Sequence, residues 1–218
     1  MGTALGCPVH SPAASFDRSE EVRSVHRAFV TAGARVVLTN TFSGSAPTAD
    51  ECAISLKLAR ASGSRYVAAS LWAGLPGKDL SRAARLLIAA GADAIWLETA
   101  TSAAQALAGL RAVRGLGPVV VTLAFVDGEV LPKLVEEGAS AVGFNCAPWP
   151  RAPGELARLA AAHAHLPLVL KPDAVGMVPA EWSIEVAAAS RAGARFVGGC
   201  CGATPAHLAA LRNLLMAQ

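Results

Sequence analysis

The sequence predicts an α/β protein: a compact (β/α)8 barrel of the TIM type whose first strand is missing or truncated at the N-terminus. Seven short apolar segments each precede a helical segment at spacings of roughly 25–35 residues, and such alternation is typical of a parallel sheet with right-handed crossovers. Polar and sulfur-bearing residues follow apolar segments at the beginning, middle and end of the chain. A closed barrel brings these strand ends to one face, whereas an open sheet spreads them out.

The main rival is an open, doubly wound sheet of the Rossmann type. No Gly-x-Gly-x-x-Gly follows an early strand, and no phosphate-binding loop is visible in the sequence. The 218 residues are near the small end for a barrel and fit one domain, residues 1–218. We therefore predict a single barrel domain.

The elements are placed by apolar periodicity and by their terminating residues. Residues 6–18, rich in Pro, Ser and Ala, are predicted to form a loop, and Ser19 is predicted to cap the next helix. His26 lies on the apolar stripe of that helix, so we interpret it as a packed, hydrogen-bonded histidine rather than a ligand. Thr204 and Pro205 are predicted to cap and begin the last helix. The predicted strands span 35–38, 66–71, 94–97, 118–125, 140–145, 168–170 and 194–197, and the predicted helices span 19–32, 50–61, 80–90, 102–113, 131–137, 154–163, 181–191 and 204 onward.

Composition limits the classes of function. The chain is 53% hydrophobic, yet no apolar run is long enough to span a bilayer, and no signal peptide is visible. The net charge of +3 is small and the Lys and Arg residues are scattered, which argues weakly against nucleic acid as a partner. Five cysteines without an export signal indicate a reducing compartment. We expect a cytoplasmic protein with neither a membrane nor a nucleic-acid partner.

Three cysteines at two strand ends are the strongest chemical signal. Cys200 and Cys201 are adjacent and flanked by glycines, and Cys146 ends an earlier apolar run. Neighbouring cysteines are poorly placed to form a disulfide with each other, but a bend at the glycines lets both sulfurs face one cation. Three thiolates leave the fourth position of a tetrahedral zinc ion open, as in catalytic sites. Alternatively, the three cysteines simply fill the core, which is how we interpret Cys7 and Cys52.

These residues resemble the zinc-dependent homocysteine S-methyltransferase family, specifically its homocysteine-binding domain. The family signatures Gly-x-Asn-Cys and Gly-Gly-Cys-Cys-Gly are present at 143–146 and 198–202, and further similarity is visible at 25–42 and 97–99. The resemblance runs over nearly the whole chain. It implies a barrel enzyme that binds Zn²⁺ through the three cysteines and transfers a methyl group to the thiol of homocysteine, giving methionine.

The resemblance also implies roles for four polar residues. Glu98 is expected to take the ammonium group of the substrate, and the alternative is a surface residue that caps helix 102–113. Burying such a carboxylate without a cation or donors would be very costly. Asn145 and Thr39 are expected to orient the substrate or the ligands through hydrogen bonds. Asp173 lies where the family usually has Pro-Asn and is predicted to serve as a substitute hydrogen-bonding partner.

The mechanism implied by the resemblance is activation of a thiol. Coordination to zinc lowers the thiol pKa from its free value near ~8.5, so a thiolate exists at neutral pH. Family members take the methyl group from S-methylmethionine, betaine or a methylated corrinoid on a separate module. The short loops of this chain make a corrinoid protein a candidate partner. The alternative function is a catalytically inactive zinc-binding relative that serves as a subunit or scaffold, which would bind metal and ignore the thiol.

The N-terminus departs from the family pattern. Residues 1–5 match the end of the family's first strand and the following loop, so the strand itself and the Asp that usually helps to hold the amino acid are missing. A parallel barrel that lacks a strand exposes two sheet edges. We expect either an earlier start of the chain or another way of filling the gap.

Overall fold

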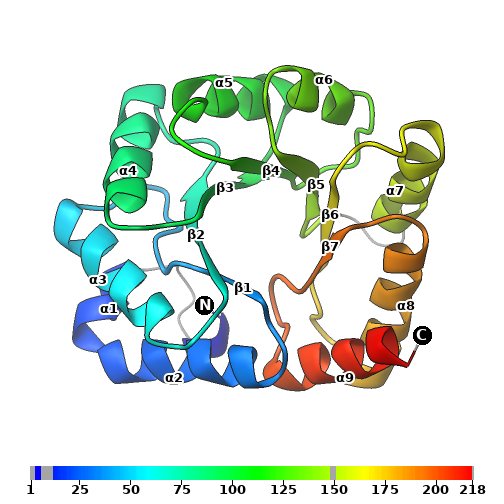
Figure 1. The fold of residues 1–218 in the computed structure, drawn as a ribbon, viewed down its shortest axis with the longest axis horizontal. Coiled ribbons are helices and arrows are strands. Elements are labelled where there is room, and N and C mark those ends of the chain that lie inside the picture. Colours follow the sequence, from blue (N-terminus) through cyan, green and yellow to red (C-terminus); the bar gives the residue numbers. More distant parts are fainter. Residues whose placement is uncertain (1–2, 6–11, 148–150, 218) are drawn as a thin grey trace.

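The structure, a computed structural model, describes residues 3–5, 12–147 and 151–217. Over this part of the chain, seven parallel strands form one sheet in the order β1-β2-β3-β4-β5-β6-β7, so every strand lies beside its neighbours in sequence. Figure 1 shows the sheet curled into an incomplete ring with the helices on its outside. The predicted alternation of strands and helices is confirmed, as is the number of strands.

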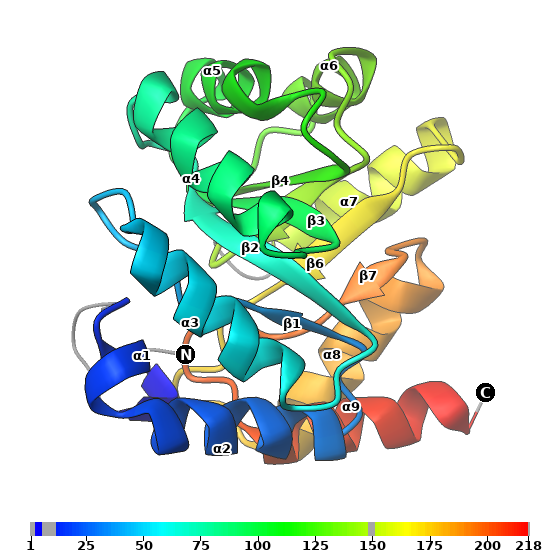
Figure 2. The same cartoon turned by 60° about the vertical axis from the view of Figure 1, so that its left-hand side comes forward.

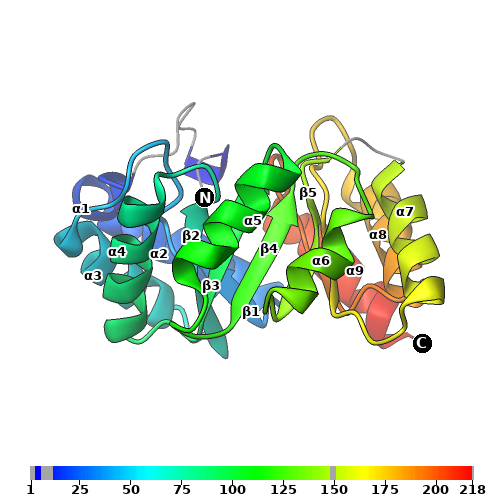
Figure 3. The ribbon, with the colours of Figure 1, turned by 90° about the horizontal axis from the view of Figure 1, so that it is seen from above.

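The strands, each of two to seven residues, are β1 (Val36–Leu38), β2 (Tyr66–Trp72), β3 (Ala94–Ala100), β4 (Val119–Leu123), β5 (Ala141–Asn145), β6 (Leu168–Lys171) and β7 (Phe196–Val197). The helices are the 3-10 turn η1 (Thr3–Leu5) and the α-helices α1 (Ala14–Asp17), α2 (Ser19–Thr31), α3 (Ala49–Arg60), α4 (Gly77–Ala89), α5 (Ala103–Val113), α6 (Val130–Glu136), α7 (Arg151–Ala162), α8 (Pro179–Arg191) and α9 (Pro205–Met216). Figure 3 shows α5 lying across β3 and β4, where it covers the outer face of the sheet. None of these helices, within the described ranges, has both the length and the apolar character needed to cross a bilayer.

The sheet does not close into a full barrel. Within the described residues, β1 pairs with β2 and β7 with β6, and no pairing joins β1 to β7. The helices nevertheless continue across this gap, because α2 and α9 lie side by side in Figures 1 and 2. Arg212 Nη1 on α9 donates a hydrogen bond of 3.4 Å to the Thr31 carbonyl at the end of α2. Over the described residues, the fold is therefore a TIM-type barrel that lacks its first strand, as predicted.

The two faces of the sheet differ in what they pack against. The large aliphatic core, which includes Leu97, Phe144 and Leu170, fills the space between the sheet and the helices. A smaller cluster around Trp96 and Val169 fills the inside of the curl. Because residues two apart on a strand share a face, the residues that follow this inner cluster along each strand also point inward at the C-terminal edge of the sheet. The candidate site is built from these residues.

Several predicted boundaries are corrected by the structure. Residues 14–17, placed in the predicted loop 6–18, form α1, which packs on α3 through a hydrogen bond of 2.8 Å between Ser15 Oγ and Ser55 Oγ. Tertiary packing thus overrides the local loop preference; residues 6–11 lie outside the described ranges.

The caps and starts of the other helices are partly as predicted. Ser19 is the first residue of α2, and Arg18 is its cap. The predicted cap and first residue of α9 are confirmed, because Thr204 and His207 form a capping box there and Pro205 begins the helix. The predicted helix starts at 80, 154 and 181 are late, since α4, α7 and α8 begin at Gly77, Arg151 and Pro179.

Candidate metal centre and substrate site

Three cysteines from two distant segments meet at the C-terminal edge of the sheet. The Sγ atoms of Cys146, Cys200 and Cys201 all lie within 4.8 Å of one another. Two sulfurs bound to one tetrahedral ion at about 2.3 Å each would be about 3.8 Å apart, which falls within this limit of 4.8 Å, so the cluster could hold a shared soft metal. All three cysteines retain some exposure, unlike the fully buried Cys52. Core filling therefore does not explain the cluster, and the three predicted ligands form a group that could hold a metal ion.

Sharp backbone bends bring the cysteines together. Cys146, directly after β5, has a φ of +50°, a left-handed conformation that is uncommon for a residue other than glycine. After β7, the Cys200 amide donates a hydrogen bond of 2.8 Å to the Pro172 carbonyl, and Gly202 has a φ of +73°. A β carbon on Gly199 would lie 2.3 Å from that of Ala203. The glycines on both sides of the cysteine pair are thus required by the turn that presents the two thiols.

The three thiols perturb one another. Hydrogen bonds from the thiols of Cys146 and Cys200 lower the pKa of Cys201 to about 3, and the bonds to Cys200 and Cys201 raise the pKa of Cys146. At neutral pH the Cys201 thiolate is therefore stabilised by its hydrogen bond with the protonated Cys146 thiol. A cation that binds all three sulfurs must displace the Cys146 proton, so its affinity is expected to rise with pH.

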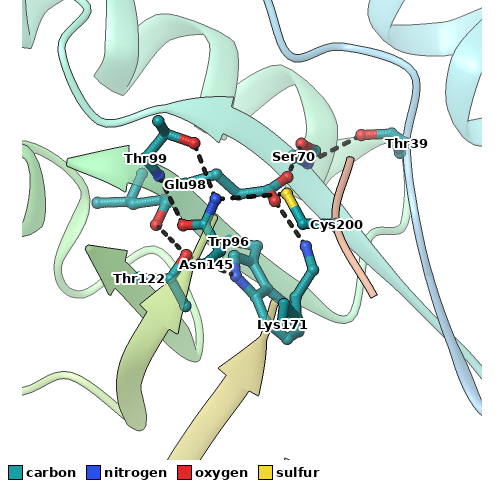
Figure 4. Close-up of polar contacts among 10 residues, drawn as sticks. Thr39, Ser70, Trp96, Glu98, Thr99, Thr122, Asn145, Lys171 and Cys200 are labelled. Carbon is teal, nitrogen blue, oxygen red and sulfur yellow. Dashed lines mark hydrogen bonds and ion pairs between the residues drawn. The ribbon is translucent and has the colours of Figure 1, made fainter. Parts of the chain in front are cut away.

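Asn145, the last residue of β5, fixes the position of one thiol. Its side chain is buried at 1% exposure, and its Nδ2 donates to Thr99 Oγ1 at 3.0 Å and to Cys200 Sγ at 3.7 Å (Figure 4). Its Oδ1 accepts a hydrogen bond of 3.0 Å from the Thr99 amide. Thr99 has a φ of +59°, and the register between β3 and β4 shifts between Leu97 and Ala100. This irregularity of β3 resembles the bulges that re-aim side chains beside active sites.

Glu98 lies in the same part of the site and is paired with a cation. Its residue exposure is 7%, its Oε2 accepts a hydrogen bond of 2.6 Å from Lys171 Nζ, and its Oε1 accepts one from the Ser70 hydroxyl (Figure 4). The alternative that Glu98 is a surface residue capping the next helix is wrong, because Ser102 caps α5. The predicted strand 94–97 is also too short, since β3 continues through Glu98 to Ala100.

Lys171 was not predicted as a site residue. It ends β6, is 9% exposed, and holds its Nζ 4.9 Å from the centroid of the Trp96 ring. Burial disfavours the charged ammonium, but the carboxylate of Glu98 and the negative charge of the cysteine cluster outweigh that effect and raise the pKa of Lys171. A signal was present in the sequence, because Lys171 is the only Lys or Arg that directly follows one of the seven predicted strands.

Thr39 and Asp173 lie near the site, but among the described residues their side chains form no hydrogen bond with the three cysteines. Thr39 Oγ1 accepts a hydrogen bond of 3.0 Å from the Ser70 amide and shares one of 2.6 Å with Thr41 Oγ1, so it supports the strand that carries the Ser70 hydroxyl. The Asp173 carbonyl accepts a hydrogen bond of 2.9 Å from Trp182 Nε1. The Asp173 carboxylate has no hydrogen bond to any other described residue. The predicted roles of Thr39 and Asp173 toward the substrate stay predictions.

Two residues interpreted as structural behave differently from each other. Cys52 is 1% exposed in the core, and burial raises its pKa to about 11, which agrees with a packing role. His26 is buried, but its Nε2 has no hydrogen-bond partner among the described residues, so the predicted hydrogen bond is wrong for this atom. Cys7, the third such residue, lies outside the described ranges.

Known proteins are similar to this chain over most of its length. The sequence model of the family described as homocysteine S-methyltransferase matches residues 1–71 and 80–215. The chain belongs to the homocysteine S-methyltransferase family. Its relatives include methionine synthase from Mycobacterium tuberculosis, which is 29% identical, and methionine synthase from Mycobacterium leprae, which is 27% identical. Each alignment covers 88% of this chain and 21% of the relative, so the chain spans about a fifth of the length of these relatives.

Solved structures confirm the barrel fold of this homocysteine S-methyltransferase family member. The apo form of the homocysteine methyltransferase MmuM from Escherichia coli superposes with a TM-score of 0.81 at 23% identity, over 98% of this chain and 93% of MmuM. The metallated form of MmuM has the same TM-score and coverage at 22% identity. At this level of identity the likeness establishes the fold, and the roles of individual residues rest on the geometry of the site.

Proposed function

We propose that this chain is a zinc-dependent S-methyltransferase that transfers a methyl group to the thiol of homocysteine and forms methionine. The observation that carries the proposal is the convergence of three partly exposed thiols at one edge of the sheet. Membership of the homocysteine S-methyltransferase family supports the transfer to homocysteine. The existence of a metallated MmuM and the soft sulfur donors support a metal such as zinc. No observation on the described residues favours the alternative of an inactive scaffold.

The protein's contribution is to hold and orient the reacting groups. Cys146, Cys200 and Cys201 would hold the zinc ion and leave one coordination position for the substrate sulfur. When bound, zinc keeps an incoming thiol in its thiolate form at neutral pH. Asn145 fixes the rotamer of Cys200 through its hydrogen bond of 3.7 Å to the sulfur and is itself fixed by Thr99. Such outer contacts orient ligands and tune the metal.

Polar residues beside the cysteines would bind the amino-acid part of the substrate. Glu98 is proposed to take the ammonium group; a carboxylate offers about four acceptor positions, and the described contacts of Glu98 use two of them. Thr39 is proposed to act one step away, by supporting Ser70 beside Glu98. The Asp173 carboxylate, which has no hydrogen bond to any other described residue, is proposed as a further polar contact.

The methyl donor is proposed to be S-methylmethionine, betaine or a methylated corrinoid. Only residues 73–76 separate β2 from α4, and residues 124–129 separate β4 from α6. We expect such short loops to leave room at the C-terminal edge of the sheet for a partner protein, which supports a protein-bound corrinoid as donor. A corrinoid protein is then the expected partner.

The proposal is tested by metal analysis combined with a donor series. We expect about one zinc per chain, homocysteine binding that requires the metal, and methionine formation with one of the three donors supplied separately. The matched variants are Cys200→Ala, which removes a ligand, and Cys52→Ala, which removes a buried thiol outside the cluster. Cys200→Ala should lose metal and thiol binding while Cys52→Ala keeps both. Full zinc loading without any homocysteine binding would overturn the proposal in favour of a scaffold.

A further inference from the structure

Lys171 and Glu98 form an ion pair inside the site proposed to bind the substrate. They come from β6 and β3, which are separated in the sheet by β4 and β5, and their side chains meet across the inside of the curl (Figure 4). The Lys171 side chain is 11% exposed and the Glu98 side chain 9% exposed, with 2.6 Å between Nζ and Oε2. The carboxylate expected to receive a substrate ammonium thus already has an ammonium beside it.

Neither partner is saturated by this pair. A lysine ammonium has three donors, and the described hydrogen bonds of Lys171 use one of them, to Glu98. The described hydrogen bonds of Glu98 come from Lys171 and from Ser70, which leaves acceptor positions on the carboxylate. The pair therefore presents one positive and one negative group side by side, each with hydrogen-bonding capacity to spare.

An α-amino acid carries the complementary arrangement. Its ammonium and carboxylate are attached to one carbon, so it can lie antiparallel to the pair, ammonium on Glu98 and carboxylate on Lys171. We propose that Lys171 binds the carboxylate of the thiol substrate and thereby selects thiols that carry both charges. The inference rests on the proposed function, because it concerns the same thiol site. A cationic thiol without a carboxylate would place its ammonium beside that of Lys171, and this like-charge contact disfavours it.

The place of Lys171 relative to the metal centre supports this role. Its carbonyl accepts a hydrogen bond of 3.1 Å from the Cys146 amide, so the base of the side chain is anchored at the cysteine cluster. Its ammonium is held over the Trp96 ring at 4.9 Å. A thiol bound at the metal would therefore have its polar end within the reach of a fixed cation. Lys171 is a specificity residue in this scheme and takes no part in methyl transfer.

The test measures thiol binding without turnover. Protein loaded with cobalt(II) in place of zinc is titrated with three thiols, and the sulfur-to-cobalt absorption is followed. The thiols are homocysteine, 4-mercaptobutyrate, which lacks the amine, and 3-mercaptopropylamine, which lacks the carboxylate. We expect homocysteine to bind about 10- to 100-fold more tightly than 3-mercaptopropylamine, the range expected for a lost hydrogen bond between charged groups. If the wild-type protein binds these two thiols with equal affinity, the proposal is overturned without any need for variants.

Variants separate recognition from a merely structural role. Lys171→Met should weaken homocysteine and 4-mercaptobutyrate by about 10- to 100-fold. It should not weaken 3-mercaptopropylamine, because the variant removes the like charge beside the ammonium of that thiol. Glu98→Gln should weaken 3-mercaptopropylamine more than 4-mercaptobutyrate. Lys133→Met on the exposed face of α6 is the matched control and should change none of the affinities.

The remaining outcomes distinguish the role of Lys171 from the proposed function of the site. If Lys171→Met weakens all three thiols equally, Lys171 acts on the structure of the site and the inference is overturned. If thiols perturb the cobalt spectrum but the carboxylate makes no difference, the inference fails while the proposed function stands. If no thiol perturbs the spectrum of the loaded protein, the proposed function fails as well.

Discussion

His26 is expected to make the stability of the fold depend on pH. The side chain on α2 is 3% exposed, and burial lowers the pKa of His26 from 6.5 to about 4. The unfolded chain therefore binds a proton that the folded protein excludes, and the free energy of unfolding falls as the pH drops from 6.5 toward 4. The difference of about 2.5 pH units, 6.5 minus 4, corresponds to about 3 kcal/mol at 1.36 kcal/mol per unit.

The measurement compares urea unfolding of wild type and His26→Leu in a chelator at several pH values. Between pH 7 and pH 4.5 the wild type should lose about 2 kcal/mol more stability than the variant, because titrating carboxylates contribute equally to both. His165→Leu, at an exposed position, is the control and should follow the wild type. Parallel curves for wild type and His26→Leu would show that the buried imidazole titrates normally, and the reasoning would be refuted.

Three further outcomes are expected from contacts in and around the site. Glu98→Gln should lower the free energy of unfolding by about 3–5 kcal/mol, because it leaves the buried Lys171 ammonium unpaired. Adding Lys171→Met should recover most of that loss, and equal losses in urea unfolding of the single and double variants would contradict this expectation. A β carbon on Gly143 would lie 1.9 Å from the Val169 carbonyl oxygen, so Gly143→Ala should cost at least about 3 kcal/mol in thermal unfolding, whereas Gly154→Ala, with nothing within 4 Å, should not destabilise. Because hydrogen bonds to the neighbouring thiols raise the pKa of one cluster thiol well above neutrality, zinc binding should release at least one proton into a weakly buffered indicator solution, and a constant pH would count against three thiolate ligands.

The architecture could be predicted because it is encoded locally. The predicted strand 118–125 is longer than β4, Val119–Leu123, but β4 packs on both faces of the sheet, and helices with an apolar stripe alternate with the strands. The cysteine cluster could be predicted for the same reason, since parallel strands place their C-terminal ends on one edge. The helix boundaries were less accurate. α1 exists because Ser15 packs against Ser55, a contact between positions 40 residues apart that no local pattern reveals.

The pairing of Glu98 with Lys171 could not be predicted from local sequence patterns, because it depends on the curvature of the sheet. β3 and β6 are not neighbours, so their end residues can meet only because the sheet curls strongly over four strands, and the degree of curl is set by packing on both faces. Yet a buried charged side chain that points into a barrel from the end of a strand requires a partner, because leaving it unpaired is very costly. Its partner must come from the other strand ends, and in this sequence those ends offer a single cation. Searching the strand ends for charge complements would have found Lys171 before the curvature was known, and with it the question of which substrate group this ammonium binds.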